Sequence, residues 1–277
     1  MPEVVRYGLV GLIVCFTAFQ EGVTGFGATA LALPFVVLLL GLKTAVPALV
    51  IQAWILALLI IVECRKLKVW GEREHESTVN APGLCLSISC NTVWREYAHI
   101  ALLVGLGLPL GIWMRQHIPE DGLKWVLAGF MVIVGAHGLI VQMMGKKHTE
   151  MTPLKRLVMS IFLPLGGVIH GAFGSGGPLV VVYATRAIAE KTVFRVTLCM
   201  MWFTMNTVLI TQSLLDKKVD HLHIFKIVGI LLPFTMVGLF IGNRAHYRIN
   251  EVAFRKLVYA VLIASGVVLV CDLVGLL

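Results

Sequence analysis

The chain has 277 residues, of which 58% are hydrophobic and only 14% are charged. That apolar content exceeds what the core of a soluble protein of this length can bury, so the composition excludes a soluble globular protein and indicates a membrane protein. The formal net charge of +8 does not indicate nucleic-acid binding, because the Lys and Arg residues occur in short clusters between apolar runs.

Nine uncharged apolar runs follow one another along the chain. Most are close to or above the roughly 20 residues that a helix needs to cross about 30 Å of hydrocarbon. The first run lacks the features of a cleavable signal peptide, so we expect it to be retained. The sequence therefore predicts an all-α, polytopic membrane protein that folds in the lipid bilayer. The runs are 7–20, 22–42, 44–62, 97–114, 125–145, 157–185, 196–215, 227–243 and 257–271.

Two of these runs contain closely spaced glycines. The first glycine cluster reads Gly22-Val-Thr-Gly-Phe-Gly27, and the second reads Gly171-Ala-Phe-Gly-Ser-Gly-Gly-Pro178. Backbone that leaves helical geometry inside a membrane is tolerated where it lines a cavity. A helix that restarts after such a break presents a partly positive N-terminus, so two restarts that meet near the midplane would form an anion site. Close helix packing is the alternative use of membrane glycines.

The glycine pattern also repeats within the chain. The first cluster recurs in the second at an offset of 149, and a later glycine set recurs at an offset of 131. A polar loop insertion at about 63–97 accounts for the difference. We therefore expect one membrane domain of two repeats, 1–150 and 151–277. In the later set, which we interpret as helix-packing glycines, Gly107, Gly111 and Gly135 are matched by Gly238, Gly242 and Gly266.

The relative orientation of the repeats depends on the number of membrane crossings. If each cluster joins a re-entrant or discontinuous helix pair, three transmembrane helices follow it and the second repeat is inverted. If each glycine-broken segment crosses twice, the repeats are parallel. The inverted arrangement places 16 of the 23 Lys and Arg residues on one side, and the parallel arrangement places 13 there. The positive-inside bias therefore favours inverted repeats with both termini outside.

Ionisable residues beside the clusters are candidates for proton coupling. Glu21 and His170 each precede the first glycine of their cluster, and a charge inside an apolar run is costly unless it faces a polar interior. Either could take up a proton during transport, and a hydrogen bond to the broken backbone is the equal alternative. Trp202 is interpreted as packing or an interface anchor.

The predicted substrate site combines the clusters with amide residues of other runs. Pro34 and Pro178 are assigned structural roles, since Pro178 suits the first turn of a helix. The residues predicted to bind the substrate are Gly22, Thr24, Gly25, Phe26, Gly27, Gln52, Gly171, Phe173, Gly174, Ser175, Gly176, Gly177 and Asn206.

The sequence contains no nucleotide-binding loop, no His-Glu-x-x-His metal motif and no Gly-x-Ser-x-Gly elbow. We therefore expect no cofactor, no metal, no catalytic residue and no enzymatic activity. The preferred function is a secondary transporter for a small anionic substrate, and a homo-oligomer is compatible with it. An anion channel of the same architecture and a membrane-embedded enzyme subunit are the alternatives.

The two clusters, together with Pro34 and the stretch Gly238-Leu-Phe-Ile-Gly-Asn-Arg244, resemble the TauE/SafE family of sulfite exporters. The resemblance implies a multi-pass protein of the bacterial inner membrane. It also implies export of sulfite, sulfoacetate or a related organosulfur anion, with a proton gradient as the driving force.

Overall fold

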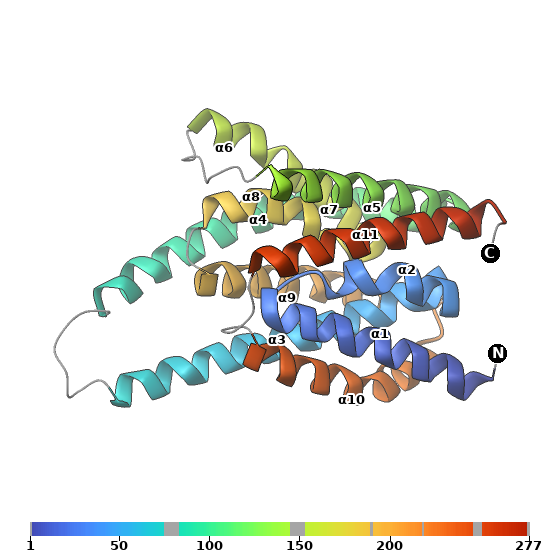
Figure 1. Cartoon of the computed structure of the whole chain (residues 1–277), viewed down its shortest axis with the longest axis horizontal. Coiled ribbons are helices and arrows are strands. Elements are labelled where there is room, and N and C mark those ends of the chain that lie inside the picture. Colours follow the sequence, from blue (N-terminus) through green and yellow to red (C-terminus); the bar gives the residue numbers. More distant parts are fainter. Residues whose placement is uncertain are drawn as a thin grey trace.

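The computed structural model of the chain describes residues 2–74, 83–144, 153–188, 191–217, 219–245 and 251–275. Within these ranges the chain forms eleven α-helices and no strand (Figure 1). Seven helical segments of the described part are long and apolar enough to cross a membrane, one of which, Arg156–Phe173, runs from within α6 through α7. The predicted all-α membrane fold is therefore confirmed. The helices are α1 (Glu3–Thr24), α2 (Ala28–Leu40), α3 (Leu42–Glu74), α4 (Gly83–His117), α5 (Glu120–Met143), α6 (Pro153–Ser160), α7 (Phe162–Phe173), α8 (Gly177–Ala187), α9 (Lys191–Leu215), α10 (His221–Ala245) and α11 (Glu251–Leu273).

Two helices that follow the glycine clusters are too short to cross a bilayer. α2 has 13 residues and α8 has 11, whereas a crossing needs roughly 20. The apolar run 22–42 is therefore not one span, because the first cluster divides it between α1 and α2. The run 157–185 begins in α6, and the second cluster divides the rest of it between α7 and α8. Each cluster thus joins a discontinuous helix pair, and three long helices follow each pair.

Glycines at the breaks supply backbone geometry that other residues adopt at a cost. Gly25 (φ 81°) and Gly174 (φ 66°) end α1 and α7 in the left-handed conformation. Their N–H groups donate to the carbonyls of Glu21 at 2.6 Å and His170 at 2.7 Å. Gly27 (φ 95°) then precedes α2. These positive φ values explain why the breaks require glycine.

The region between the third and fourth long apolar runs differs from the prediction. We expected a polar loop over about 63–97. The structure instead continues α3 to Glu74 and begins α4 at Gly83, and the intervening residues 75–82 lie outside the described part. The described parts of the polar stretch therefore belong to two helices.

Helices from the two halves of the chain pack against each other reciprocally. α1 packs along α10, and α7 packs along α4. In the first pair Gly238 lies against the carbonyl of Cys15, and in the second Gly107 lies against the carbonyl of Pro164. The offset of 131 relates Gly107 to Gly238, and the offset of 149 relates Cys15 to Pro164, so the two contacts are equivalent. The later glycines are therefore at close helix contacts, as interpreted from their spacing.

The first glycines of the two clusters belong to the same packing surfaces. A Cβ at Gly22 would lie 3.0 Å from the Cα of Gly242, and one at Gly171 would lie 3.0 Å from the Cα of Gly111. Gly22 and Gly171, which we expected to bind the substrate, thus make helix contacts.

The remaining long helices complete the bundle. α3 packs on α9, and α5 packs on α11. Figure 1 shows the long helices running roughly side by side, with the N- and C-termini both at the right-hand end of the bundle. Buried apolar side chains from most helices form one continuous core cluster.

Replacing Gly107 by valine should destabilise the bundle, because the new Cβ would overlap the carbonyl of Pro164. Overpacking of this kind costs about 1–3 kcal/mol or more. We expect the apparent melting temperature of the detergent-purified protein to fall by several degrees, measured by thermal unfolding. Gly105→Val is the matched control, because an added Cβ there meets nothing within 4 Å. Equal melting temperatures for the two variants would show that the α4–α7 contact is not tight.

Candidate functional site

Both glycine clusters border one small cavity inside the bundle. Its volume is about 20 Å³, enough for about one water molecule. The cavity is surrounded by α1, α2, α3, α7, α8, α9 and the two breaks. Its lining residues are Glu21, Gly27, Thr29, Ala30, Ala53, His170, Gly174, Ser175, Gly177, Trp202 and Asn206.

The beginnings of both short helices reach this cavity. Gly27, Thr29 and Ala30 belong to the start of α2, and Gly177 is the first residue of α8. The first four N–H groups of a helix have no partner within it, and the helix dipole makes this end partly positive. The two helix starts therefore bring positive potential to one place without a basic side chain among the lining residues.

Glu21 already interacts with one of these helix starts. Its side chain is 2% exposed, and its Oε2 accepts a hydrogen bond from the N–H of Ala28 at 3.1 Å. The carboxylate of α1 thus caps the N-terminus of α2 across the break. An anion that binds at this end of α2 would compete with Glu21 for the same N–H group.

His170 makes the corresponding contact at the second break. Its Nδ1 accepts a hydrogen bond from the N–H of Gly176 at 3.4 Å, which places the proton of the neutral ring on Nε2. The ring lies 5.3 Å from that of Trp202, centre to centre. His170 Nε2–H is therefore a donor held in place by backbone and by an aromatic ring.

Four polar atoms of the cavity lining lack a hydrogen-bond partner of good geometry among the described residues. They are His170 Nε2, Ser175 Oγ, Trp202 Nε1 and Asn206 Oδ1, of which the His170 and Asn206 side chains still interact with each other. A buried polar group without a partner costs about 1–3 kcal/mol, so their gathering in one cavity calls for a ligand or water. Three of the four groups can donate, and the amide of Asn206 becomes a donor if its oxygen and nitrogen exchange places.

Arg195 is a basic residue beside the first break that sequence reasoning missed. A Cβ at Gly25 would lie 2.6 Å from Arg195 Cγ, and the guanidinium interacts electrostatically with Glu21. The guanidinium also donates to Asn243, which in turn donates to Glu63. Its position at the edge of an apolar run was a signal that we did not use.

Thr24 and Phe26, which we predicted to bind the substrate, lie beside the cavity. Thr24 Oγ1 donates to the Phe26 carbonyl at 2.9 Å, and Gln20 Nε2 donates to the same carbonyl at 2.8 Å. The Phe26 ring packs edge-on against Phe194 at 6.0 Å. These residues hold the shape of the first break.

Four further predicted residues also lie outside the lining. Gly25 contacts Arg195, Phe173 is in the core with no exposed surface, and a Cβ at Gly176 would overlap the Gly166 carbonyl. Gln52 bridges α3 and α10, because its amide donates to the Val228 carbonyl at 3.2 Å and accepts from Thr235.

The two prolines, which we predict to have structural roles, belong to the two short helices. Pro34 is inside α2, and Pro178 is in the first turn of α8. A proline at the start of a helix loses no internal hydrogen bond. In the described ranges, no three His, Cys, Asp or Glu side chains gather closely enough to hold a metal ion.

Comparison with known proteins assigns the chain to a family. A family model described as sulfite exporter TauE/SafE matches residues 87–269, which include the second glycine cluster. The probable inner membrane transporter protein TsaS of Comamonas testosteroni is 24% identical over 175 residues, which cover 62% of this chain and 70% of that protein. No solved structure matches significantly. With more than half of its length matched, the chain belongs to the TauE/SafE family of membrane transporters.

Proposed function

We propose that this chain is a secondary transporter that carries a small oxyanion of the sulfite or organosulfonate class across the bacterial inner membrane. The oxyanion would bind in the cavity between the two glycine breaks. The observation that carries the proposal is the convergence of three buried donors on the starts of α2 and α8: Ser175 and Trp202, which have no partner among the described residues, and His170, which faces Asn206.

The chemistry of a sulfite or sulfonate group suits these donors. Each group has three oxygens that accept hydrogen bonds, and charge-assisted hydrogen bonds are stronger than neutral ones. Helix N-termini add favourable potential without a buried cation. The TauE/SafE membership supports the same class of anion.

The size of the cavity supports a carrier that changes shape. A volume of about 20 Å³ is too small for a sulfonate, so the lining must separate before the substrate enters. In our proposal the two halves are inverted repeats that move relative to each other, so that the site opens alternately to each side. The reciprocal α1–α10 and α7–α4 contacts and the common end of the two termini support inverted repeats (Figure 1). The Lys and Arg distribution supports an orientation with both termini outside.

Glu21 supplies a simple coupling of protons to the anion. As a carboxylate it occupies the Ala28 N–H and repels a second negative charge. Once protonated, it no longer repels the anion and holds that N–H less strongly. Proton binding and anion binding should therefore favour each other, and His170 would serve as the neutral donor at the opposite break.

The proposal is tested at Trp202, whose indole N–H has no partner in the described part of the chain. Trp202→Phe keeps an aromatic ring beside His170 but removes the donor. Hydrogen bonds to charged groups contribute about 1.5–3 kcal/mol, so we expect the affinity for ethanesulfonate to fall by about 10- to 100-fold. The measurement is the ethanesulfonate-dependent rise in melting temperature of the purified protein.

Trp54→Phe is the matched control for that experiment. Trp54 Nε1 donates to Thr207 at 2.8 Å, and its ring stacks on Phe203, so the substitution removes an indole donor outside the cavity. We expect wild-type affinity for Trp54→Phe. If Trp202→Phe also bound ethanesulfonate as tightly as the wild type, the indole would not contact the anion and the proposed site would be wrong.

A further inference from the structure

A second, much larger cavity opens at the end of the bundle where α3 and α10 begin. Its volume is about 890 Å³, and we call it the vestibule. It is formed by the first residues of α3, α5 and α10 and the last residues of α4 and α9. In Figure 1 these ends lie at the same side of the bundle as both termini.

Acidic side chains of the vestibule already have partners. Glu120 accepts from the N–H of Leu42 at 3.0 Å and pairs with Lys124 at 3.8 Å. Asp220 accepts from the N–H of His223 at 3.1 Å, at the start of α10. Asp216 lies close enough to Arg115 to attract it.

Arg115 lies at the inner end of this vestibule. Its guanidinium donates to the amide oxygen of Gln212, a neutral acceptor, and Asp216 is the acidic side chain that attracts it. Arg115 is also shared with a smaller pocket deeper in the bundle, together with Ser213. The positive charge of Arg115 therefore lies where the vestibule meets the smaller pocket.

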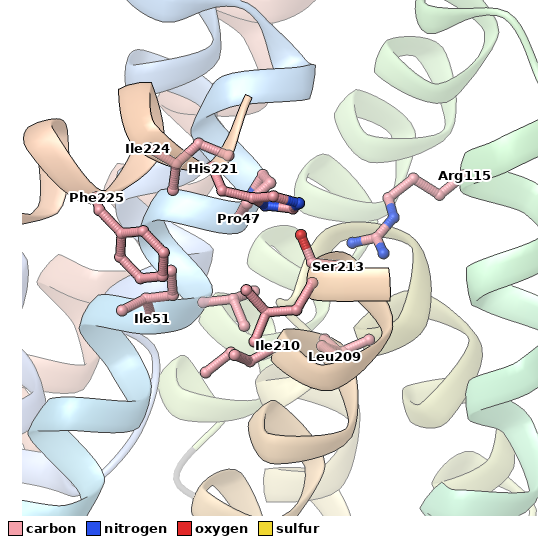
Figure 2. Close-up of a pocket in the computed structure, with 11 residues that line it drawn as sticks. Pro47, Ile51, Arg115, Leu209, Ile210, Ser213, His221, Ile224 and Phe225 are labelled. Carbon is pink, nitrogen blue, oxygen red and sulfur yellow. The ribbon is translucent and has the colours of Figure 1, made fainter. Parts of the chain in front are cut away.

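Three polar groups meet in that smaller pocket. Figure 2 shows the Arg115 guanidinium, the Ser213 hydroxyl and the His221 ring directed toward one another. The rest of the lining that Figure 2 labels is apolar and includes Ile51 and Leu209. A guanidinium, a hydroxyl and an imidazole beside apolar side chains suit an oxyanion. Because the volume of this pocket is only about 20 Å³, the anion would be held from the vestibule side.

The floor of this pocket adjoins the small cavity between the two glycine breaks, which we call the central cavity. Val50 lines the pocket, and its Cγ2 lies where a Cβ on Gly174 would be. Gly174 lines the central cavity on the other side. One layer of side chains therefore separates the Arg115 pocket from the second glycine break.

We propose that Arg115, Ser213 and His221 form a second anion station, where an oxyanion is held at the vestibule before it enters or after it leaves the central cavity. The station rests on the proposed function, because it is useful only if the cargo is an anion. It adds a defined site on the outer side of the central cavity and makes Arg115 its principal charged group.

The test measures the local charge at Ser213 with a substituted cysteine. Ser213→Cys is treated, in right-side-out vesicles, with membrane-impermeant methanethiosulfonates that carry either a sulfonate or a trimethylammonium group. Protein without the substitution gives the background rate. We expect the anionic reagent to be favoured, and Arg115→Gln to lower the anionic-to-cationic rate ratio by about tenfold or more.

Two charge variants serve as controls. Arg115→Lys retains the charge and should retain most of the preference, and Asp216→Asn removes a negative charge and should increase it. Ethanesulfonate should slow the anionic reagent, whereas the neutral, slightly smaller dimethyl sulfone should not. If Arg115→Gln does not fold, the Asp216→Asn and ethanesulfonate measurements still test whether the anion station exists.

The station is refuted if the rate ratio is the same with and without the Arg115 charge, or if the Ser213→Cys variant reacts with neither reagent above the background rate. This failure is separable from a failure of the proposed function, because labelling requires no transport. An unchanged ratio together with oxyanion binding in the central cavity would refute the station alone. A charge-dependent ratio without oxyanion binding at Trp202 would refute the proposed central site alone.

Discussion

Replacing Gly174 by valine should abolish anion transport while leaving the protein in the membrane. Gly174 has φ 66°, which a β-branched residue adopts only with strain, and the new side chain would overlap Val50. The second break would then lose the geometry that aims Ser175 and the start of α8 at the cavity. We expect uptake of radiolabelled ethanesulfonate into proteoliposomes to fall by about 100-fold or more, which corresponds to roughly 2.7 kcal/mol.

The control for this experiment is Gly129→Val. Gly129 lies within α5, and an added Cβ meets nothing within 4 Å, so we expect wild-type uptake. Both variants should elute as single peaks in size-exclusion chromatography after detergent extraction. Wild-type transport by a well-folded Gly174→Val protein would mean that the second break does not form the substrate site.

Glu21→Gln should uncouple anion binding from pH. In the wild type we expect ethanesulfonate affinity to rise as pH falls, because protonation of Glu21 removes its charge and loosens its hold on the Ala28 N–H. The glutamine variant is neutral at every pH, so its affinity should stay near the wild-type acidic value. Titrations of purified protein between about pH 5 and 8 measure this difference.

Glu3→Gln provides the comparison for Glu21→Gln. Glu3 is at the start of α1 and pairs with Arg6 at 3.5 Å, away from the cavity lining. Its variant should keep the wild-type pH dependence. If Glu21→Gln keeps that dependence as well, the coupling proton binds elsewhere and His170 becomes the next residue to test.

The discontinuous helices were predictable from sequence because local chemistry determines them. Gly25, Gly27 and Gly174 adopt positive φ. Because glycine adopts this conformation more readily than other residues, a cluster of glycines in the sequence indicates such a break. The later glycines were interpretable for a related reason, since Gly107 and Gly238 face neighbouring backbone at equivalent places. The family resemblance based on these motifs is confirmed by the family model.

The lining of the central cavity was predictable only in part. Glu21, His170 and Asn206 are identifiable because they interrupt apolar runs, and Ser175 because it lies in the second glycine cluster; all four line the cavity. Gly22 and Gly171 belong to the same motifs but face α10 and α4. Sequence spacing does not show which side of a helix meets a cavity and which meets a neighbouring helix.

The role of Trp202 and the vestibule could not be derived from local patterns. A tryptophan within an apolar run is usually packing or an interface anchor, and Trp202 became a candidate donor only when its N–H was found buried without a partner among the described residues. Arg115 and Ser213 are far apart in sequence, and the packing of α4 beside α9 brings them together. Such sites depend on how helices are arranged.

The most direct test of the central claim is a calorimetric titration of the purified wild-type protein with ethanesulfonate and, separately, with dimethyl sulfone. If His170, Ser175 and Trp202 bind an oxyanion at the helix starts, ethanesulfonate should bind saturably, and Trp202→Phe should weaken that binding by about 10- to 100-fold. Dimethyl sulfone, which has a similar shape but no charge, should give no saturable heat. Equal binding of the two compounds, or ethanesulfonate binding that Trp202→Phe leaves unchanged, would contradict the account.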